Sequence, residues 1–232
     1  LLDGDGKIVK AEGKEVMART TLKLDKEKTA EVVQNLLVSH PKLWDLDFPY
    51  RYTVETIIKK GGKTIDKYLT PFGIRSVKFD KDKGFFLNNK HLKLKGMCLH
   101  QDAGCLGTAV PDRAYERRLL ILKEFGTNAI RCSHNPPSPE FLNYCDSIGF
   151  LVIDEAFDKW KSGYYEEFFD SSWQQDISDM VIRDRNHPSV ILWSIGNELA
   201  EAKLKDDTGI ERAGMLQDFV HQLDPSRLVM LA

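Results

Sequence analysis

The chain of 232 residues is 42% hydrophobic and carries 33 basic against 35 acidic side chains, for a net charge of −2. No apolar run approaches the roughly 20 residues that span a bilayer. The balanced charge also lacks the basic excess that binds nucleic acid or an anionic membrane. We therefore expect a globular protein whose partner is a neutral polar molecule such as a carbohydrate, with no nucleic acid and no membrane as partners.

The four cysteines have no CxxC spacing, and two of them, Cys98 and Cys132, fall inside predicted core strands. This pattern favours free buried thiols over a disulfide framework or a metal site. The sequence does not report the compartment, and both the periplasm and the cytoplasm stay open as locations.

Residues 1–78 have the rhythm of short strands and turns. Asp-Gly pairs at residues 3–6 mark a turn ahead of an apolar segment, and residues 52–57 alternate before a turn at Gly61-Gly62. The pattern predicts an immunoglobulin-like β-sandwich, in part only, because fewer strands are present than the roughly seven that such a sandwich needs.

Residues 79–232 begin with a predicted hairpin over 85–94 and then alternate strands with helices. The predicted strands cover residues 94–99, 128–132, 151–153, 190–195 and 228–231, and the predicted helices cover 112–126, 138–149, a segment ending near 187, and 209–223. This alternation is typical of a (β/α)8 barrel or a doubly wound sheet. Because a complete barrel takes about 250 residues, we expect the hairpin and the first five strands of an incomplete TIM barrel, in a fragment of a longer protein.

The segment 190–198 is the most informative part of the chain, because an apolar strand opens there into Asn197 and Glu198. Parallel strands covered on both faces are apolar without alternation, and barrel enzymes place their reactive groups where such strands end. Glu198 is therefore the first candidate for a catalytic group. The alternative is that Glu198 caps the following helix or pairs with an arginine.

Other polar side chains follow the remaining predicted strands, and all would surround one mouth of the barrel. These residues are His100, Asp102, Arg131, His134, Asp154 and Glu155. Asp154 and Glu155 can instead form structural ion pairs, and His187, just before Pro188, is expected at a helix end rather than in a site. Trp193 is expected in the core.

Five segments, in order and at matching spacing, resemble glycoside hydrolase family 2, which includes β-galactosidases and β-glucuronidases. They are residues 71–75 (PFGIR), 94–104 (LKGMCLHQDAG), 128–136 (NAIRCSHNP), 154–157 (DEAF) and 186–198 (NHPSVILWSIGNE). The resemblance runs over nearly the whole chain. It implies a second sandwich domain followed by the first five strands of a TIM barrel.

The resemblance implies a retaining exo-β-glycosidase that hydrolyses terminal β-galactosides in carbohydrate catabolism. Glu198 would be the general acid and then the general base, and the nucleophilic Glu would follow a seventh strand beyond this chain. The fragment alone is therefore not expected to hydrolyse a glycoside. Alternatives are a β-glucuronidase or β-mannosidase of the same family, or a carbohydrate-binding relative without catalysis.

The resemblance also implies roles for four further residues. Asn197 would bind the sugar 2-hydroxyl, His134 and Asp102 would line the sugar subsite, and Arg131 would hold the nucleophile in place. A buried arginine can orient a carboxylate through two hydrogen bonds, although Arg131 can equally tie strands together.

No cofactor is expected. Some β-galactosidases of the family bind magnesium through a Glu and a His in the loop after the third barrel strand, and residues 156–163 contain no His. A metal-dependent hydrolase that uses His100, His134 and Asp154 is a further alternative, disfavoured because no HxH pair ends the first barrel strand. A homo-oligomer is compatible with the sequence.

Overall fold

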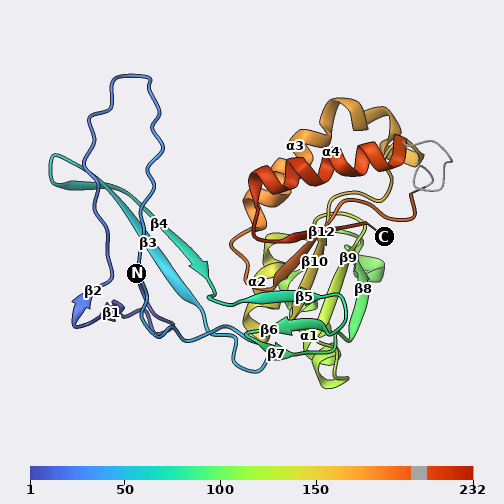
Figure 1. Ribbon diagram of the computed structural model, residues 1–232, viewed down its shortest axis with the longest axis horizontal. Helices are drawn as coiled ribbons and strands as arrows, with labels where there is room; N and C mark the ends of the chain where they lie inside the picture. The colour runs from blue at the N-terminus through green and yellow to red at the C-terminus, as the bar shows by residue number, and fades with distance from the viewer. Residues whose placement is uncertain (200–207, 232) are drawn as a thin grey trace.

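The computed structural model describes residues 1–199 and 208–231, which form a β-rich N-terminal part and an α/β part (Figure 1). The N-terminal part contains β1 (Lys10–Ala11) paired with β2 (Lys14–Glu15), and a long ribbon of β3 (Tyr52–Lys60) and β4 (Lys63–Phe72). The two strands of the ribbon are antiparallel and turn at Gly61 and Gly62, as the sequence predicts. This part is the incomplete β-sandwich.

The α/β part contains a parallel sheet of five strands whose spatial order follows the sequence, β12-β11-β10-β9-β8. The strands are β8 (Gly96–His100), β9 (Ala129–Ser133), β10 (Leu151–Glu155), β11 (Val190–Ser194) and β12 (Leu228–Met230). Each strand pairs in parallel with its neighbour in the chain. The arrangement is that of an incomplete (β/α)8 barrel, so the predicted fold class is confirmed.

Helices follow the strands at the predicted places. They are α1 (Asp112–Glu124), α2 (Pro139–Ile148), α3 (Glu166–Asp184) and α4 (Thr208–Leu223), with short 3-10 turns η1 (Gly104–Leu106) and η2 (Gly163–Tyr165). Ser138 caps α2 by accepting a hydrogen bond from the Phe141 amide at 3.3 Å. Gly149 ends α2 with a φ of 85°, and a Cβ there would lie 2.2 Å from the Leu46 carbonyl oxygen. Only glycine fits this helix end.

Two apolar cores cover the two faces of the parallel sheet. On the outer face, Val152 and Trp193 pack with the buried sides of the helices, including Leu119 and Met180. At the amino ends of the strands, the inner face packs on a small sheet of β5 (Val77–Asp80), β6 (Gly84–Leu87) and β7 (Lys90–His91). The buried residues on that side are Trp44, Phe85, Leu87, Ala129, Leu151 and Ile191. Burial on both faces explains why the strands are apolar without alternation.

The cysteine prediction is correct in part. All four thiols are free, and Cys132 and Cys145 are buried, but Cys98 and Cys105 are exposed. Cys98 lies on β8, an edge strand of the described sheet, and a strand sequence alone does not reveal whether a second neighbour covers it. Among the described residues, none of the helices has the length and apolar content needed to span a membrane.

Candidate active site

The carboxylate of Glu155 is the centre of a buried polar cluster at the carboxyl ends of β9, β10 and β11. Its Oε2 accepts hydrogen bonds from Arg131 Nε at 2.9 Å, Arg131 Nη2 at 2.6 Å and Ser194 Oγ at 2.6 Å. Its Oε1 lies 2.5 Å from Nδ1 of His134. The Glu155 side chain is 0% exposed to solvent, whereas the side chains of Arg131 and His134 are 18% and 21% exposed. The two partners therefore face the mouth, and the acid lies behind them.

Arg131 joins this acid to the loop after β11. Its Nη2 also donates to Asn197 Oδ1 at 2.9 Å, so one guanidinium holds two partners. Burial would lower the pKa of Arg131, but the hydrogen bond and charge of Glu155 raise it above its usual value. The cation is thus a permanent bridge between β10 and the Asn197–Glu198 pair.

The amide of Asn197 is fixed from its other side by the loop after β10. Its Nδ2 donates to Asp158 Oδ1 at 2.9 Å, and its backbone amide donates to the Asp158 carbonyl at 2.8 Å. Burial would raise the pKa of Asp158, but the bonds from Asn197 and Lys159 lower it. Lys159 Nζ bonds the Asn197 carbonyl at 3.0 Å and lies 3.8 Å from Glu198 Oε2. The loop therefore orients Asn197 and places a cation beside Glu198.

Glu198 stands at the end of a tight turn after β11. Gly196 has no room for a side chain, because a Cβ there would lie 2.8 Å from Leu199 Cδ1 and 3.1 Å from Trp160 Nε1. Trp160 Nε1 in turn donates to the Ile195 carbonyl at 2.6 Å. Glu198 has a φ of 47°, and its side chain is 80% exposed. A left-handed non-glycine residue carries strain on the order of 1 kcal/mol or more, which is common at functional sites.

The structure thus brings together four of the five predicted site residues, namely Arg131, His134, Asn197 and Glu198, and leaves out Asp102. The side chain of Asp102 is exposed, and its hydrogen bonds are made by its backbone: its amide donates to the His100 carbonyl at 2.8 Å, and its carbonyl accepts from Arg118. Its neighbour His100 reaches the cluster through its ring, which meets the His134 ring edge-on at 5.2 Å between centroids.

Asp154 does not form the ion pair considered for it. It is fully buried next to Cys132 and Asp184, and neither carboxyl oxygen has a hydrogen-bond partner among the described residues. Burial, and then the charge of Asp184, raises the pKa of Asp154 well above its usual value. Glu155, by contrast, is paired with Arg131, so the two adjacent acids have opposite environments.

His187 and Trp193 have the structural places predicted for them. His187 Nδ1 lies 2.6 Å from Asp146 Oδ2, just beyond the end of α3 and before β11. The Trp193 side chain is buried in the outer core, where its Nε1 donates to Asp224 Oδ2 at 2.9 Å. Neither residue belongs to the cluster around Glu155.

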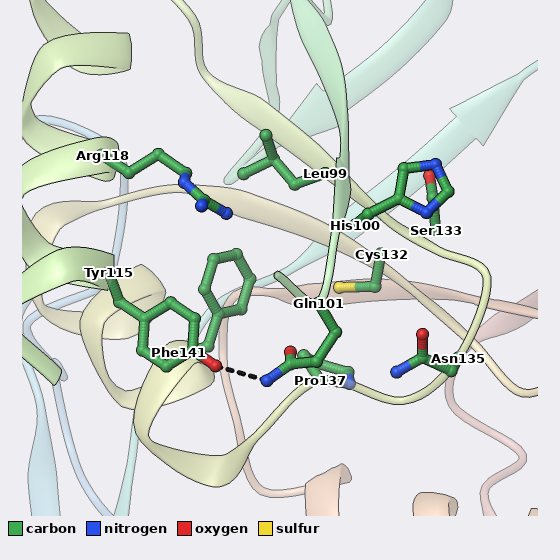
Figure 2. A pocket seen from close by; sticks show the side chains of 10 residues that line it. All are labelled: Leu99, His100, Gln101, Tyr115, Arg118, Cys132, Ser133, Asn135, Pro137 and Phe141. Atoms are coloured by element: carbon green, nitrogen blue, oxygen red, sulfur yellow. Dashed lines mark hydrogen bonds between the residues drawn. The ribbon is translucent and has the colours of Figure 1, made fainter. Parts of the chain in front are cut away.

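Two hollows adjoin the cluster. The one in Figure 2 lies beside His100 and Ser133, is crossed by the hydrogen bond from Gln101 to Tyr115, and has a volume of about 10 Å³, room for one water. The second, about 480 Å³, opens between His134, the loop at Asp158 and α3. Only the second has the volume of a small-molecule pocket.

The described residues include no group of three or more acidic, histidine or cysteine side chains arranged to hold a metal ion. Glu155 and Lys159 lie near the mouth, but no site role was predicted for either. Glu155 had a signal, because it follows a predicted strand and was expected either at the mouth or in a structural ion pair. Lys159 had none, because nothing in the pattern of a loop fixes where its side chain lies.

Comparison with known proteins shows the family to which the chain belongs. Residues 3–75 match the model of glycosyl hydrolases family 2, and residues 77–232 match the model of the TIM barrel domain of that family. A protein of Bacteroides ovatus named beta-galactosidase is 49% identical over 91% of this chain, and a beta-glucuronidase of Bacteroides fragilis is 31% identical over 95%. The chain spans 26% and 32% of the lengths of these two relatives.

Solved structures agree with the sequence comparisons. A glycosyl hydrolase family 2 member from Bacteroides cellulosilyticus matches with a TM-score of 0.81 and 46% identity, over 85% of this chain and 26% of that one. A β-glucuronidase from Ruminococcus gnavus, in complex with D-glucaro 1,5-lactone, matches with a TM-score of 0.79 and 29% identity, over 98% of this chain and 36% of that one.

Proposed function

Because the chain belongs to glycosyl hydrolase family 2, we propose that it supplies the proton-donor half of a retaining exo-β-glycosidase that acts on terminal β-galactosides. The main observation in support of this proposal is the Asn197–Glu198 pair at the carboxyl end of β11, in which Asn197 is held by both Arg131 and Asp158. A longer polypeptide, the full-length hydrolase, would contribute the remaining strands and the nucleophilic carboxylate.

In this proposal Glu198 gives its proton to the glycosidic oxygen as the bond to the leaving group breaks. After the glycosyl group has moved to the nucleophile, Glu198 takes a proton from the water that releases the sugar. Retention requires the two carboxyl groups to lie about 5 Å apart. The exposed carboxylate of Glu198 has space on its open side for such a partner.

Galactose is favoured over glucuronate by two observations. The relative with 49% identity is named a beta-galactosidase, whereas relatives named putative beta-glucuronidase and beta-glucuronidase are 40% and 31% identical. In addition, Arg131 and Lys159, the two cations of the cluster, are already paired with protein oxygens. A sugar carboxylate would need a cation of its own, whereas a neutral sugar needs only hydrogen bonds.

The first test measures hydrolysis of aryl β-galactosides and β-glucuronides by the full-length hydrolase. Glu198→Gln should lower kcat/KM by about 100-fold to 10,000-fold, the usual contribution of a positioned acid. The loss should be greater for a poor leaving group than for an activated one, because an activated leaving group departs with less protonation. Glu124→Gln, an exposed acid at the end of α1, is the matched control and should keep full activity.

The proposal fails if Glu198→Gln turns over every substrate as fast as the wild type. A full-length hydrolase that binds galactosides without cleaving them would instead indicate the carbohydrate-binding alternative. Faster cleavage of glucuronides than of galactosides would keep the enzyme class and correct the sugar.

A further inference from the structure

Glu155 is a buried acid whose hydrogen-bonding capacity is used by the residues of the sugar site. Arg131 occupies Oε2 with two donors, Ser194 adds a third to the same oxygen, and His134 lies against Oε1. No surface of Glu155 remains open to solvent. It therefore cannot touch a sugar unless the cluster comes apart.

From this geometry we propose that Glu155 is the positioning residue of the sugar subsite. It acts through two routes, holding the His134 ring at the mouth and holding Arg131, which in turn fixes the amide of Asn197. The inference rests on the proposed glycosidase function and adds to it a residue that never contacts substrate.

The route through Arg131 leads to a definite orientation of Asn197. Oδ1 of Asn197 accepts from Arg131 and Nδ2 donates to Asp158, so the amide cannot flip without losing both bonds. One hydrogen on Nδ2 and one lone pair on Oδ1 are left for a ligand. In the proposed mechanism that ligand is the sugar 2-hydroxyl, whose hydrogen bonds strengthen in the transition state.

The charge of Glu155 is needed as well as its shape. A neutral side chain would leave the Arg131 guanidinium with weaker partners in a site that is mostly closed to water, and the guanidinium could turn toward another anion. One such anion in the full-length hydrolase is the nucleophile. A displaced Arg131 would therefore loosen Asn197 and change the surroundings of the nucleophile together.

Asp154 provides the control, because it lies on the same buried strand as Glu155 but points to the opposite face of the sheet. It lies among Cys132, Asp184 and the outer core, and no residue of the cluster bonds it. A change there tests whether the substitution of any buried acid in β10 reduces activity. A specific effect of Glu155 should be absent from Asp154→Asn.

The experiment compares an aryl β-galactoside with its 2-deoxy analogue on the full-length hydrolase, as wild type, Glu155→Gln and Asp154→Asn. Misplacing a positioned group costs about 100-fold, and we expect Glu155→Gln to lower kcat by that factor while KM changes little, because the lost contacts tighten only in the transition state. The 2-deoxy substrate should lose about 10-fold less, since it cannot use Asn197.

Equal losses on the two substrates would overturn the proposal, because a general structural effect ignores the 2-hydroxyl. An unchanged kcat in Glu155→Gln would also overturn it, while Glu198→Gln still reports on the glycosidase itself. If Glu155→Gln does not fold, Ser194→Ala replaces it. That variant removes one bond to Oε2 and should lose about 3-fold to 10-fold, again less on the 2-deoxy substrate; a loss that is equal on both sugars overturns the proposal.

Discussion

The arginines at the two ends of the half-barrel, the partly buried Arg131 and the buried Arg227, make different kinds of contact. At the carboxyl end, Arg131 donates to the side chains of Glu155 and Asn197. At the amino end, Arg227 donates to the carbonyl oxygens of Val190, Arg185 and His187 at 2.8, 2.9 and 3.1 Å, and to Asp224 Oδ2 at 2.6 Å. Arg227 thus joins backbone segments at the end of α3 and the start of β11, whereas Arg131 orients side chains that a ligand can use.

A second arginine strengthens the amino end. Arg75 donates from Nε to the Pro188 carbonyl at 2.7 Å and from Nη2 to the Val190 carbonyl at 2.5 Å. Burial, and then the charge of Arg227, lowers the pKa of Arg75 to about 10. Arg75 comes from the segment between the sandwich and the barrel, so it attaches the N-terminal part to the start of β11. We therefore expect substitutions of Arg131, at the carboxyl end, to reduce activity, and substitutions of Arg227, at the amino end, to reduce stability.

The largest effect is expected for Arg131→Lys. Lysine keeps the charge but has no planar fork, so it cannot hold Glu155 and Asn197 in their present geometry. We expect kcat/KM on an aryl β-galactoside to fall by about 100-fold or more, with a small change in Tm. A large drop in Tm together with normal activity per folded molecule would show that Arg131 acts only as a structural tie.

Arg227→Lys is the same change at the other end. Lysine cannot reach all three carbonyl oxygens, and each buried acceptor left unpaired costs about 1 to 3 kcal/mol. We expect the free energy of unfolding in urea to fall by about 2 to 3 kcal/mol and kcat to stay unchanged. A loss of kcat without a loss of stability would contradict the division between the two ends.

Much of the fold could be predicted from the sequence. Apolar runs without alternation identified the parallel strands, and the structure places Arg131, His134 and Glu198 at or just beyond the carboxyl ends of those strands. Helix ends were predictable where local chemistry fixes them, as at Ser138 and Gly149. These features depend on neighbours in the chain, which a sequence displays directly.

The roles of Asp154, Glu155 and Asp102 were not predictable to the same degree. Successive residues of a strand face opposite sides, but the run at 151–153 is apolar on both, so nothing shows which of the two acids faces the interior. Asp102 lies beyond the end of β8 in a loop, where periodicity gives no direction. Only the folded structure shows that Asp102 is exposed, that Glu155 is paired and that Asp154 is unpaired among the described residues.

The next effect concerns Asp224, which joins Arg227 to the outer core. Burial would raise its pKa, but hydrogen bonds from Ser226 and the charge of Arg227 lower it to about 2. Since the unfolded value is about 3.9, this carboxylate stabilises the fold fully above about pH 4 and loses its contribution as the pH falls through 2. The wild type should lose about 2 kcal/mol over that window. Urea unfolding at several pH values should show a smaller loss in Asp224→Asn; an identical acid response would contradict the assignment.

The smallest effect is expected for Asp154→Asn, although the residue is fully buried. Its folded pKa is raised, so the folded state binds the proton more tightly than the unfolded chain, and wild-type stability falls as the pH rises from about 4 toward the folded value. An amide has the shape of the neutral acid and no charge to desolvate, and its NH₂ can donate to Asp184. Unfolding at pH 7 should therefore change by no more than about 1 kcal/mol, with a flatter dependence on pH than in the wild type. A loss of about 3 kcal/mol or more would mean that Asp154 is a paired carboxylate, and the contrast with Glu155 on the same strand would then disappear.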